Sequence, residues 1–246
     1  MKRTFIAPVL LLLLVACSRV YVPAKAEYQV QEISLQLPVD SGMLRLTQVY
    51  RDSINKSMNE VIGRLEGTLE KKQPSGSLNN FIADAMLVMA REKVNANTDV
   101  ALVNYGGMRV NQLAAGPVTR GKIFELMPFD NYLIVQELRG DVFQSFLDLV
   151  AERGGWAIAG CSFDIRNKKA ANIRIAGKPL DATKTYYVAN SDYVANGGDN
   201  ANMLRTLPQQ NTGYLMRDAI IDYVRALQAQ GKTILVNNEK RIGHAE

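Results

Sequence analysis

The sequence at positions 187–199 reads Tyr-Val-Ala-Asn-Ser-Asp-Tyr-Val-Ala-Asn-Gly-Gly-Asp. Its first residues continue an apolar stretch that predicts a strand over 184–190, and a loop that contains Tyr193 follows the strand. Six residues after Tyr193, a Gly-Gly-Asp turn ends in Asp199. A tyrosine ring can stack on a flat ligand, and a carboxylate can accept both hydroxyl hydrogens of a ribose. Because Gly-Gly-Asp also serves as a simple chain reversal, this stretch alone leaves both interpretations open.

Two further loops carry residues that a protein core rarely needs. Residues 104–109 read Asn-Tyr-Gly-Gly-Met-Arg and follow an apolar strand expected over 99–104. Arg109 can grip a carboxylate, a phosphate or a hydroxyl there, or it can lie solvated in a tight turn. Residues 127–131 read Met-Pro-Phe-Asp-Asn, so that Phe129 is either an exposed platform or a plug of the core below a turn.

Hydrophobic periodicity predicts the elements around these loops. Residues 77–86 read Ser-Leu-Asn-Asn-Phe-Ile-Ala-Asp-Ala-Met and begin a helix that runs to about Val94, with Ser77 as its N-cap. A strand softened by glycine is expected over 61–69. Further helices are expected over 44–58, 120–126, 141–153 and 214–230, and further strands over 28–36, 132–138, 157–165 and 171–176. The irregular alternation indicates a single α+β domain, a mixed sheet with packed helices.

Five segments, taken in order, resemble the C-terminal domain of the bacterial and animal 5'-nucleotidase family over about residues 61–242. They are Leu-Asn-Asn-Phe-Ile-Ala-Asp-Ala-Met, Asn-Tyr-Gly-Gly-Met-Arg, Met-Pro-Phe-Asp-Asn, Ala-Gly-Cys-Ser-Phe-Asp and Asn-Ser-Asp-Tyr-Val-Ala-Asn-Gly-Gly-Asp. One such match would be weak, but five in order are specific. In that family an N-terminal metallophosphoesterase domain holds two metal ions and performs hydrolysis, and the C-terminal domain grips the nucleoside. The resemblance therefore implies a nucleoside-binding fold.

Matched motif by motif, the resemblance implies a site in which two aromatic rings enclose the base, a carboxylate accepts the ribose hydroxyls and polar side chains complete the grip. The residues at these positions are, in that order, Phe129 and Tyr193, then Asp199, then Arg109 and Asn131. A glycine before the Ala-Gly-Cys strand also contributes in relatives. Gly154 is the candidate for it here, with Gly155 as the alternative.

The sequence also departs from the family pattern. Relatives carry further basic residues before the Leu-Asn-Asn helix, where Lys72 is the nearest equivalent and Thr68 fills another position. A lysine offers a point charge instead of the arginine fork, so a weaker grip is expected. Tyr105 and Asn200 both stand where glycine is common. The resemblance therefore implies a pocket of somewhat altered shape.

The metal-bearing catalytic domain of the family has no expected counterpart in this sequence, because residues 18–60 are too few to form it. Phosphoester hydrolysis would need metal-activated water. The single histidine, His244, is close to the C-terminus, and the carboxylates of Asp84, Asp192 and Asp199 lie on separate elements. We therefore expect no catalytic residue, metal or other cofactor in this chain, and divalent metals only in a separate catalytic partner.

The N-terminal residues have the pattern of a bacterial lipoprotein signal. Lys2 and Arg3 precede a short apolar run, and Leu-Val-Ala stands directly before Cys17. We expect a lipid on Cys17 to anchor the chain in the extracytoplasmic envelope, at the periplasm or outer membrane; an ordinary signal peptide is the alternative. The expected organisation is a signal peptide over 1–16, a tether over 17–40, a linker-type helix over 41–59 and the nucleotidase-like domain over 60–246.

Composition narrows the classes of partner and site. Removal of residues 1–16, which include Lys2 and Arg3, lowers the formal net charge from +5 to +3, so nucleic acid is not an expected partner. Two cysteines exclude a disulfide framework, and Cys161 is expected to be a small buried apolar residue.

Three functional interpretations remain. The favoured one is a membrane-anchored nucleoside- or nucleotide-binding module that serves extracytoplasmic nucleotide hydrolysis together with a separate metallophosphoesterase chain, which docks near 44–58. The second is a structural envelope lipoprotein with a vestigial pocket. The third is a hydrolase that acts on its own.

Overall fold

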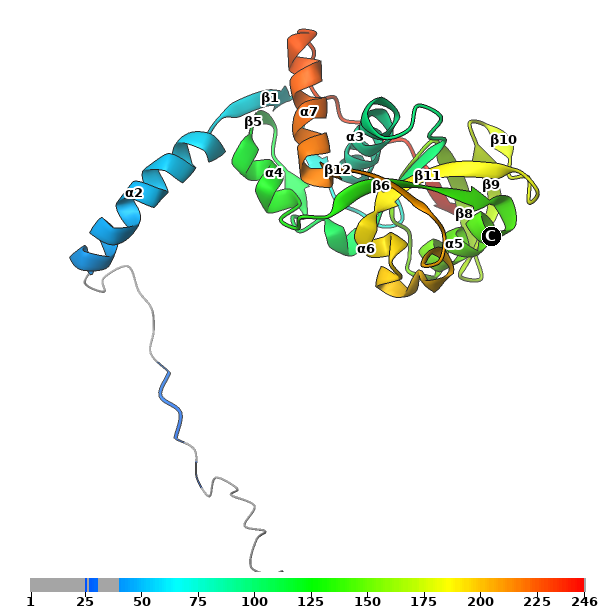
Figure 1. The fold of residues 1–246 in the computed structure, drawn as a ribbon, viewed down its shortest axis with the longest axis horizontal. Helices are drawn as coiled ribbons and strands as arrows, with labels where there is room; N and C mark the ends of the chain where they lie inside the picture. Colours follow the sequence, from blue (N-terminus) through cyan, green and yellow to red (C-terminus); the bar gives the residue numbers. More distant parts are fainter. Residues whose placement is uncertain (1–24, 26, 31–39, 246) are drawn as a thin grey trace, which may run out of the picture. The chain divides into compact units, whose positions relative to one another are not determined.

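The computed structural model describes residue 25, residues 27–30 and residues 40–245 (Figure 1). Cys17 and the signal sequence lie outside the described residues, as does most of the strand expected over 28–36. The chain divides between Leu46 and Thr47 into two units. Helix α2 (Ser41–Met58) covers the segment where the sequence predicts a helix, and it begins in the first unit and ends in the second.

A five-stranded mixed sheet forms the centre of the second unit, in the order β12-β6-β11-β3-β7. Strand β3 (Val100–Val103) is buried throughout, as its apolar sequence predicts, and runs parallel to β11 (Thr185–Ser191). Alternate residues of a strand face opposite sides, so Val103 enters one core and Leu102 the other. The other strands of this sheet pair antiparallel and are β6 (Tyr132–Arg139), β7 (Ala157–Ala159) and β12 (Gln209–Leu215).

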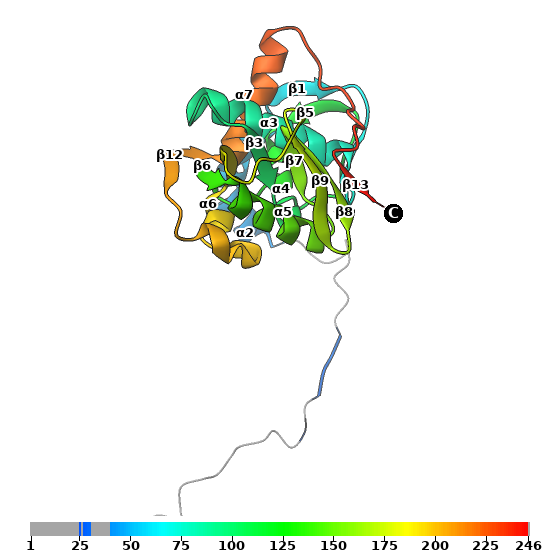
Figure 2. The same ribbon diagram turned by 90° about the vertical axis from the view of Figure 1, so that its right-hand side faces the viewer.

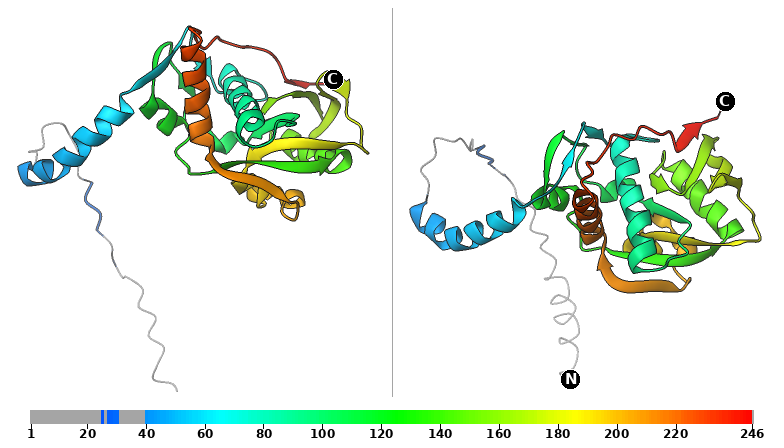
Figure 3. Two further views of the ribbon diagram at one scale, coloured as in Figure 1. Left: turned by 45° about the horizontal axis from the view of Figure 1, so that its top comes forward. Right: turned by 90° about the horizontal axis from the view of Figure 1, so that it is seen from above.

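Helices cover both faces of this sheet. Helices α3 (Ser77–Lys93) and α7 (Met216–Ala229) lie side by side over one face (Figures 1 and 3). Helix α5 (Gly140–Glu152) covers the other face, where Phe143 and Phe146 are fully buried. A second sheet packs beside α5 (Figure 2), and its order is β10 (Lys178–Pro179), β9 (Lys169–Ile175), β8 (Cys161–Arg166) and β13 (Ile242–His244).

The structure divides the strand expected over 61–69 into two short strands, β1 (Val61–Leu65) and β2 (Leu69–Glu70). They pair with different strands, which are β5 (Gly116–Thr119) and β4 (Gln112–Leu113), respectively. The expectation of one long strand was wrong because the chain changes its pairing partner between the two halves.

Two helix starts also differ from the expectation. Ser77 is not an N-cap but the first residue of α3, and its Oγ accepts the backbone N–H of Glu70 at 2.9 Å. Helix α7 begins at Met216 instead of Tyr214, because Tyr214 and Leu215 belong to strand β12, in which Leu215 pairs with Tyr132 of β6. In both cases a contact with a remote segment sets the boundary.

The α+β class that the sequence predicts is confirmed. The short elements of the second unit are helices α4 (Arg120–Leu126) and α6 (Asp192–Ala195) and the 3₁₀ turns η1 (Tyr105–Gly107), η2 (Gly198–Asn200) and η3 (Asn202–Leu204). Within the described part of the chain, no helix combines the length and the apolar character that crossing a bilayer requires.

Candidate functional site

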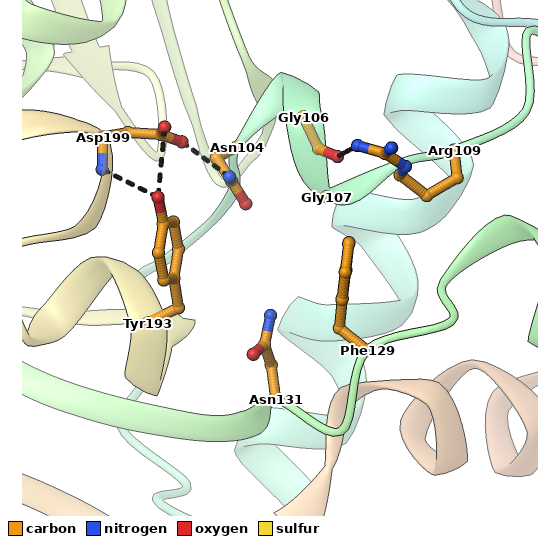
Figure 4. A pocket seen from close by; sticks show the side chains of 8 residues that line it. All are labelled: Asn104, Gly106, Gly107, Arg109, Phe129, Asn131, Tyr193 and Asp199. Carbon is orange, nitrogen blue, oxygen red and sulfur yellow. Dashed lines mark hydrogen bonds between the residues drawn. The ribbon is translucent and has the colours of Figure 1, made fainter. Parts of the chain in front are cut away.

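Three loops meet at one edge of the central sheet. Strands β3 and β11 are parallel, so the loops that follow them leave from the same edge. The segment 127–131 arrives there too, because β6 is antiparallel to β11 and begins opposite its end, with Leu133 paired to Ser191. Together the loops line a cavity of about 400 Å³ (Figure 4), formed by Asn104, Gly106, Gly107, Arg109, Phe129, Asn131, Tyr193 and Asp199.

Five of the six residues that the resemblance assigns to the nucleoside site line this cavity: Arg109, Phe129, Asn131, Tyr193 and Asp199. Phe129 and Tyr193 lie on opposite sides, with the amide of Asn131 between them (Figure 4). Both aromatic residues remain 46–47% exposed, so Phe129 is not a plug of the core. An open slot between two exposed rings fits a flat aromatic ligand.

The Tyr193 wall of the cavity is held together by its own side chains. The hydroxyl of Tyr193 accepts the backbone N–H of Asp199 at 3.3 Å and lies 3.5 Å from its Oδ1, to which it donates. The ring packs on the turn at Gly198, where an added Cβ would lie 2.5 Å from Cε1 of Tyr193. Ring and carboxylate are therefore fixed relative to each other.

Asn104 is a cavity residue that the sequence analysis did not single out. Its Nδ2 donates to Oδ2 of Asp199 at 2.6 Å, although the two residues are far apart in the sequence. A Cβ on Gly107 would lie 2.8 Å from Oδ1 of Asn104, so glycine is what lets this amide lie against the η1 turn. The only sequence signal was its position directly after an apolar strand, in the same motif as Arg109.

The Phe129 wall is held from outside by α7. Arg217, with only 9% of its side chain exposed, donates from Nη2 to Oδ1 of Asp130 at 2.5 Å and from Nη1 to the Met127 carbonyl at 3.5 Å. Its guanidinium also lies 4.1 Å from the ring centroid of Phe124. Arg217 thus fixes the residues on both sides of the Pro-Phe pair and, through them, the place of Phe129.

Two cations lie beside the η1 turn, and of the two Arg109 lines the cavity and Lys71 does not. Arg109 is exposed, lies 5.5 Å from the ring centroid of Phe129 and makes a long contact of 3.4 Å to the Gly106 carbonyl. Lys71 donates to the Met108 carbonyl at 2.7 Å, and its Nζ lies 3.9 Å from the ring centroid of Tyr105. Burial, and then the charge of Arg109, lower the pKa of Lys71. An anion in the cavity could bind Arg109 directly and would act on Lys71 only through the charge that it brings next to Arg109.

The structure corrects the expected equivalent of the family's basic residues. Lys72 is 71% exposed, lies 3.9 Å from Glu70 and borders another hollow, so it does not reach the cavity. Its neighbour Lys71 is the lysine that adjoins Arg109. Thr68 and Asn200 do not line the cavity either. Adjacent residues of an extended segment point in opposite directions, so Lys71 lies beside Arg109 and Lys72 points away from it, and neither lysine lines the cavity.

Gly154 is the predicted site residue that the structure does not bring into the cavity. It ends helix α5 in a left-handed turn with φ of +81°, and a Cβ there would lie 3.2 Å from Nε2 of Gln73. Gly155, the alternative, is left-handed as well, with φ of +100°, and a Cβ there would lie 2.8 Å from the Pro74 carbonyl oxygen. Both glycines shape the turn after α5.

Cys161 is buried and free, as expected, and burial raises the pKa of its thiol to about 12. Across the described residues, no three His, Cys, Asp or Glu side chains gather so that they could hold a metal ion.

Comparisons with known proteins identify the family of this chain. The family described as 5'-nucleotidase, C-terminal domain, matches residues 59–206. The chain belongs to this family. Among curated relatives of this 5'-nucleotidase C-terminal domain protein, the protein UshA of Yersinia enterocolitica is 28% identical over 195 residues, which are 77% of this chain and 35% of that protein. The 5'-nucleotidase of Vibrio cholerae is 26% identical over 78% of this chain and 35% of its own length. The chain thus spans about a third of the length of these relatives.

A solved structure extends the likeness to three dimensions. The 5'-nucleotidase precursor from Thermus thermophilus superposes with a TM-score of 0.73 and 28% identity over 85% of this chain and 44% of that protein. The NAD nucleotidase of Haemophilus influenzae, at 16% identity and a TM-score of 0.65, shares the fold. The α+β architecture of this chain is therefore that of a 5'-nucleotidase C-terminal domain.

Proposed function

We propose that the chain binds a nucleoside or nucleotide in the cavity at the edge of its central sheet. The observation that carries this proposal is the pair of exposed rings, Phe129 and Tyr193, on opposite sides of a slot that ends at a held carboxylate. In this proposal the rings enclose the base and Asp199 accepts the ribose hydroxyls. Arg109 and Asn131 are the polar clamps.

Calorimetric titration of adenosine, AMP and ribose into the purified chain tests this proposal. We expect adenosine and AMP to bind and ribose alone to bind weakly, because stacking supplies a large part of the affinity. Asp199→Asn should lower the affinity for adenosine and leave the affinity for free adenine nearly unchanged. Equal losses for both ligands would mean that Asp199 only holds the turn. The absence of binding by any of them would favour a structural lipoprotein with an emptied pocket.

We further propose that the chain serves extracytoplasmic nucleotide hydrolysis together with a separate metallophosphoesterase that brings its own divalent metals. The match to the family of 5'-nucleotidase C-terminal domains supports the link to nucleotide hydrolysis. Nucleic acid is not part of the proposal. Phosphate release from AMP by the chain alone in the presence of Mn²⁺, Zn²⁺ or Mg²⁺ would contradict it.

The partner is proposed to dock along α2, which has no buried residue and exposes Val49, Tyr50 and Ile54 by 75%, 70% and 55%. A pull-down that recovers AMP-hydrolysing activity with the full chain should lose it when residues 40–58 are deleted. The double variant Tyr50→Ser/Ile54→Ser should lose it too, whereas the polar-face variant Arg51→Gln/Lys56→Gln should retain it. Recovery that none of these changes affects would remove α2 as the docking element.

Membrane attachment is proposed to occur through a lipid on Cys17. The chain should incorporate labelled palmitate when it is expressed in a bacterium, and Cys17→Ala should abolish the label. Cys161→Ala is the matched control, because that cysteine is buried in the folded chain. A wild-type chain that takes up no label would show that the N-terminal segment is an ordinary signal peptide, and a label that survives Cys17→Ala would contradict Cys17 as the lipidated residue.

A further inference from the structure

The hydroxyl of Tyr193 makes contacts that a stacking ring does not need. Base stacking uses the face of the ring, and the hydroxyl at its edge contributes nothing to it. Here the hydroxyl meets Asp199 twice, at the backbone N–H and at Oδ1. Figure 4 shows both contacts running from the Tyr193 hydroxyl to Asp199. The group is thus directed at the proposed ribose acceptor.

Asp199 needs such support because its backbone conformation is unfavourable. Its φ is +51°, in the left-handed region that non-glycine residues seldom adopt, and the next residue, Asn200, has φ of +67°. Gly197 before them is left-handed as well, at +94°. A turn of this kind keeps one geometry only when its surroundings determine it. The contacts from Tyr193 and Asn104 supply that determination at Asp199.

We infer that the Tyr193 hydroxyl is a positioning group that gives this site its preference for ribosides, a role that rests on the proposed nucleoside function. By holding the main chain and the carboxylate of Asp199, it sets the acceptor at a fixed place beside the base slot. A ligand with a base and free 2' and 3' hydroxyls then meets a carboxylate that is already oriented. A free base, or a nucleoside without those hydroxyls, gains nothing from this arrangement.

Tyr193→Phe isolates the hydroxyl, because the ring and its packing on Gly198 remain. The full chain, its Tyr193→Phe variant and a Tyr132→Phe control are titrated with adenosine, adenine and 2',3'-dideoxyadenosine. Tyr132 is 39% exposed on β6 and outside the cavity lining, so the control removes a partly exposed hydroxyl of the same kind. We expect Tyr193→Phe to lower the affinity for adenosine about fivefold, which is the effect of about one hydrogen bond. The affinities for the other two ligands should change by less than about twofold. Thermal melting verifies that both variants fold.

A double-mutant cycle asks whether the hydroxyl acts through Asp199. If it does, adding Tyr193→Phe to the Asp199→Asn variant should lower the affinity for adenosine by less than about twofold. Full additivity of the two changes would overturn the inference. So would an adenosine affinity that Tyr193→Phe leaves unchanged, or an equal loss for adenine. Wild-type chain that binds none of the three ligands would overturn the proposed function and, with it, this inference, so the two failures are distinguishable.

Discussion

The two aromatic walls of the cavity are similar in exposure and opposite in construction. Tyr193 is tied to Asp199, six residues further on, by its own hydroxyl. Phe129 has no such tether, and the segment around it is fixed by Arg217, which comes from helix α7 far along the chain. One wall therefore combines stacking and polar recognition in a single local unit, whereas the other separates the stacking ring from the contacts that position it.

The largest effect should come from Tyr193→Ala. This change removes the stacking surface and the support of Asp199 together, so we expect a loss of about 2–4 kcal/mol in adenosine binding. Adenine, which uses only the stacking surface, should lose less. Calorimetric titration of both ligands gives the comparison. Equal losses would show that this wall does not combine the two functions.

Phe129→Ala should have a smaller effect, and its pattern should differ. Only stacking is lost, together with the contact of Arg109 over the ring, so we expect about 1–3 kcal/mol for adenosine and for adenine alike. The same titrations measure it. A loss confined to adenosine would mean that Phe129 orients the ribose, and it would remove the difference between the walls.

Arg217→Met tests the external support of the Phe129 wall. Removal of the guanidinium breaks the bond to Asp130, which is 76% exposed, so we expect the free energy of unfolding to fall by only about 1–2 kcal/mol. The affinities for adenosine and for adenine should both fall about threefold, because the Phe129 ring is held less firmly. A threefold loss is about half the free energy of one lost hydrogen bond. Urea unfolding and titration provide the two measurements.

The control for this change is Arg225→Met on the same helix. Arg225 pairs with Glu60, and both side chains are about 45% exposed, so the expected loss of stability is below about 1 kcal/mol. Ligand affinity should stay unchanged because neither residue lines the cavity. If Arg225→Met weakened adenosine as strongly as Arg217→Met, the effect would come from α7 as a whole and not from the Phe129 segment.

The same comparison explains what the sequence could predict. The fold class follows from hydrophobic periodicity, and the five residues that meet in the cavity follow from the resemblance, whose motifs hold the informative residues close together along the chain. The Tyr193 wall is of this kind, because ring, turn and carboxylate all lie within 187–199. In that wall, residues that are close together in the sequence are also close together in space. The strands are less well predicted: the single strand expected over 157–165 is β7 and β8, which lie in different sheets, and β12 was not expected.

The rest depends on contacts between remote segments. The bond from Asn104 to Asp199 joins loops that follow two different strands, and Arg217 reaches its loop from another helix. Gly154 was expected in the nucleoside site, but its left-handed conformation instead ends α5 beside Gln73. Composition and spacing singled out neither Asn104 nor Arg217, because tertiary packing decides what each residue touches.

Lys71 supplies the smallest expected effect, a pH dependence at the cationic end of the cavity. Its pKa is below the usual lysine value, because burial and Arg109 both disfavour its charged form. A phosphate held by Arg109 favours charged Lys71, so AMP should bind best below this lowered pKa. The ratio of the AMP affinity to the adenosine affinity should fall about two- to threefold as the pH rises through the pKa of Lys71. This is the size of one screened contact between charges. Titration between about pH 7 and pH 10 measures this ratio. Lys71→Gln should flatten the curve and Lys72→Gln should not; the reverse result would return the role to Lys72 and place the phosphate outside this cavity.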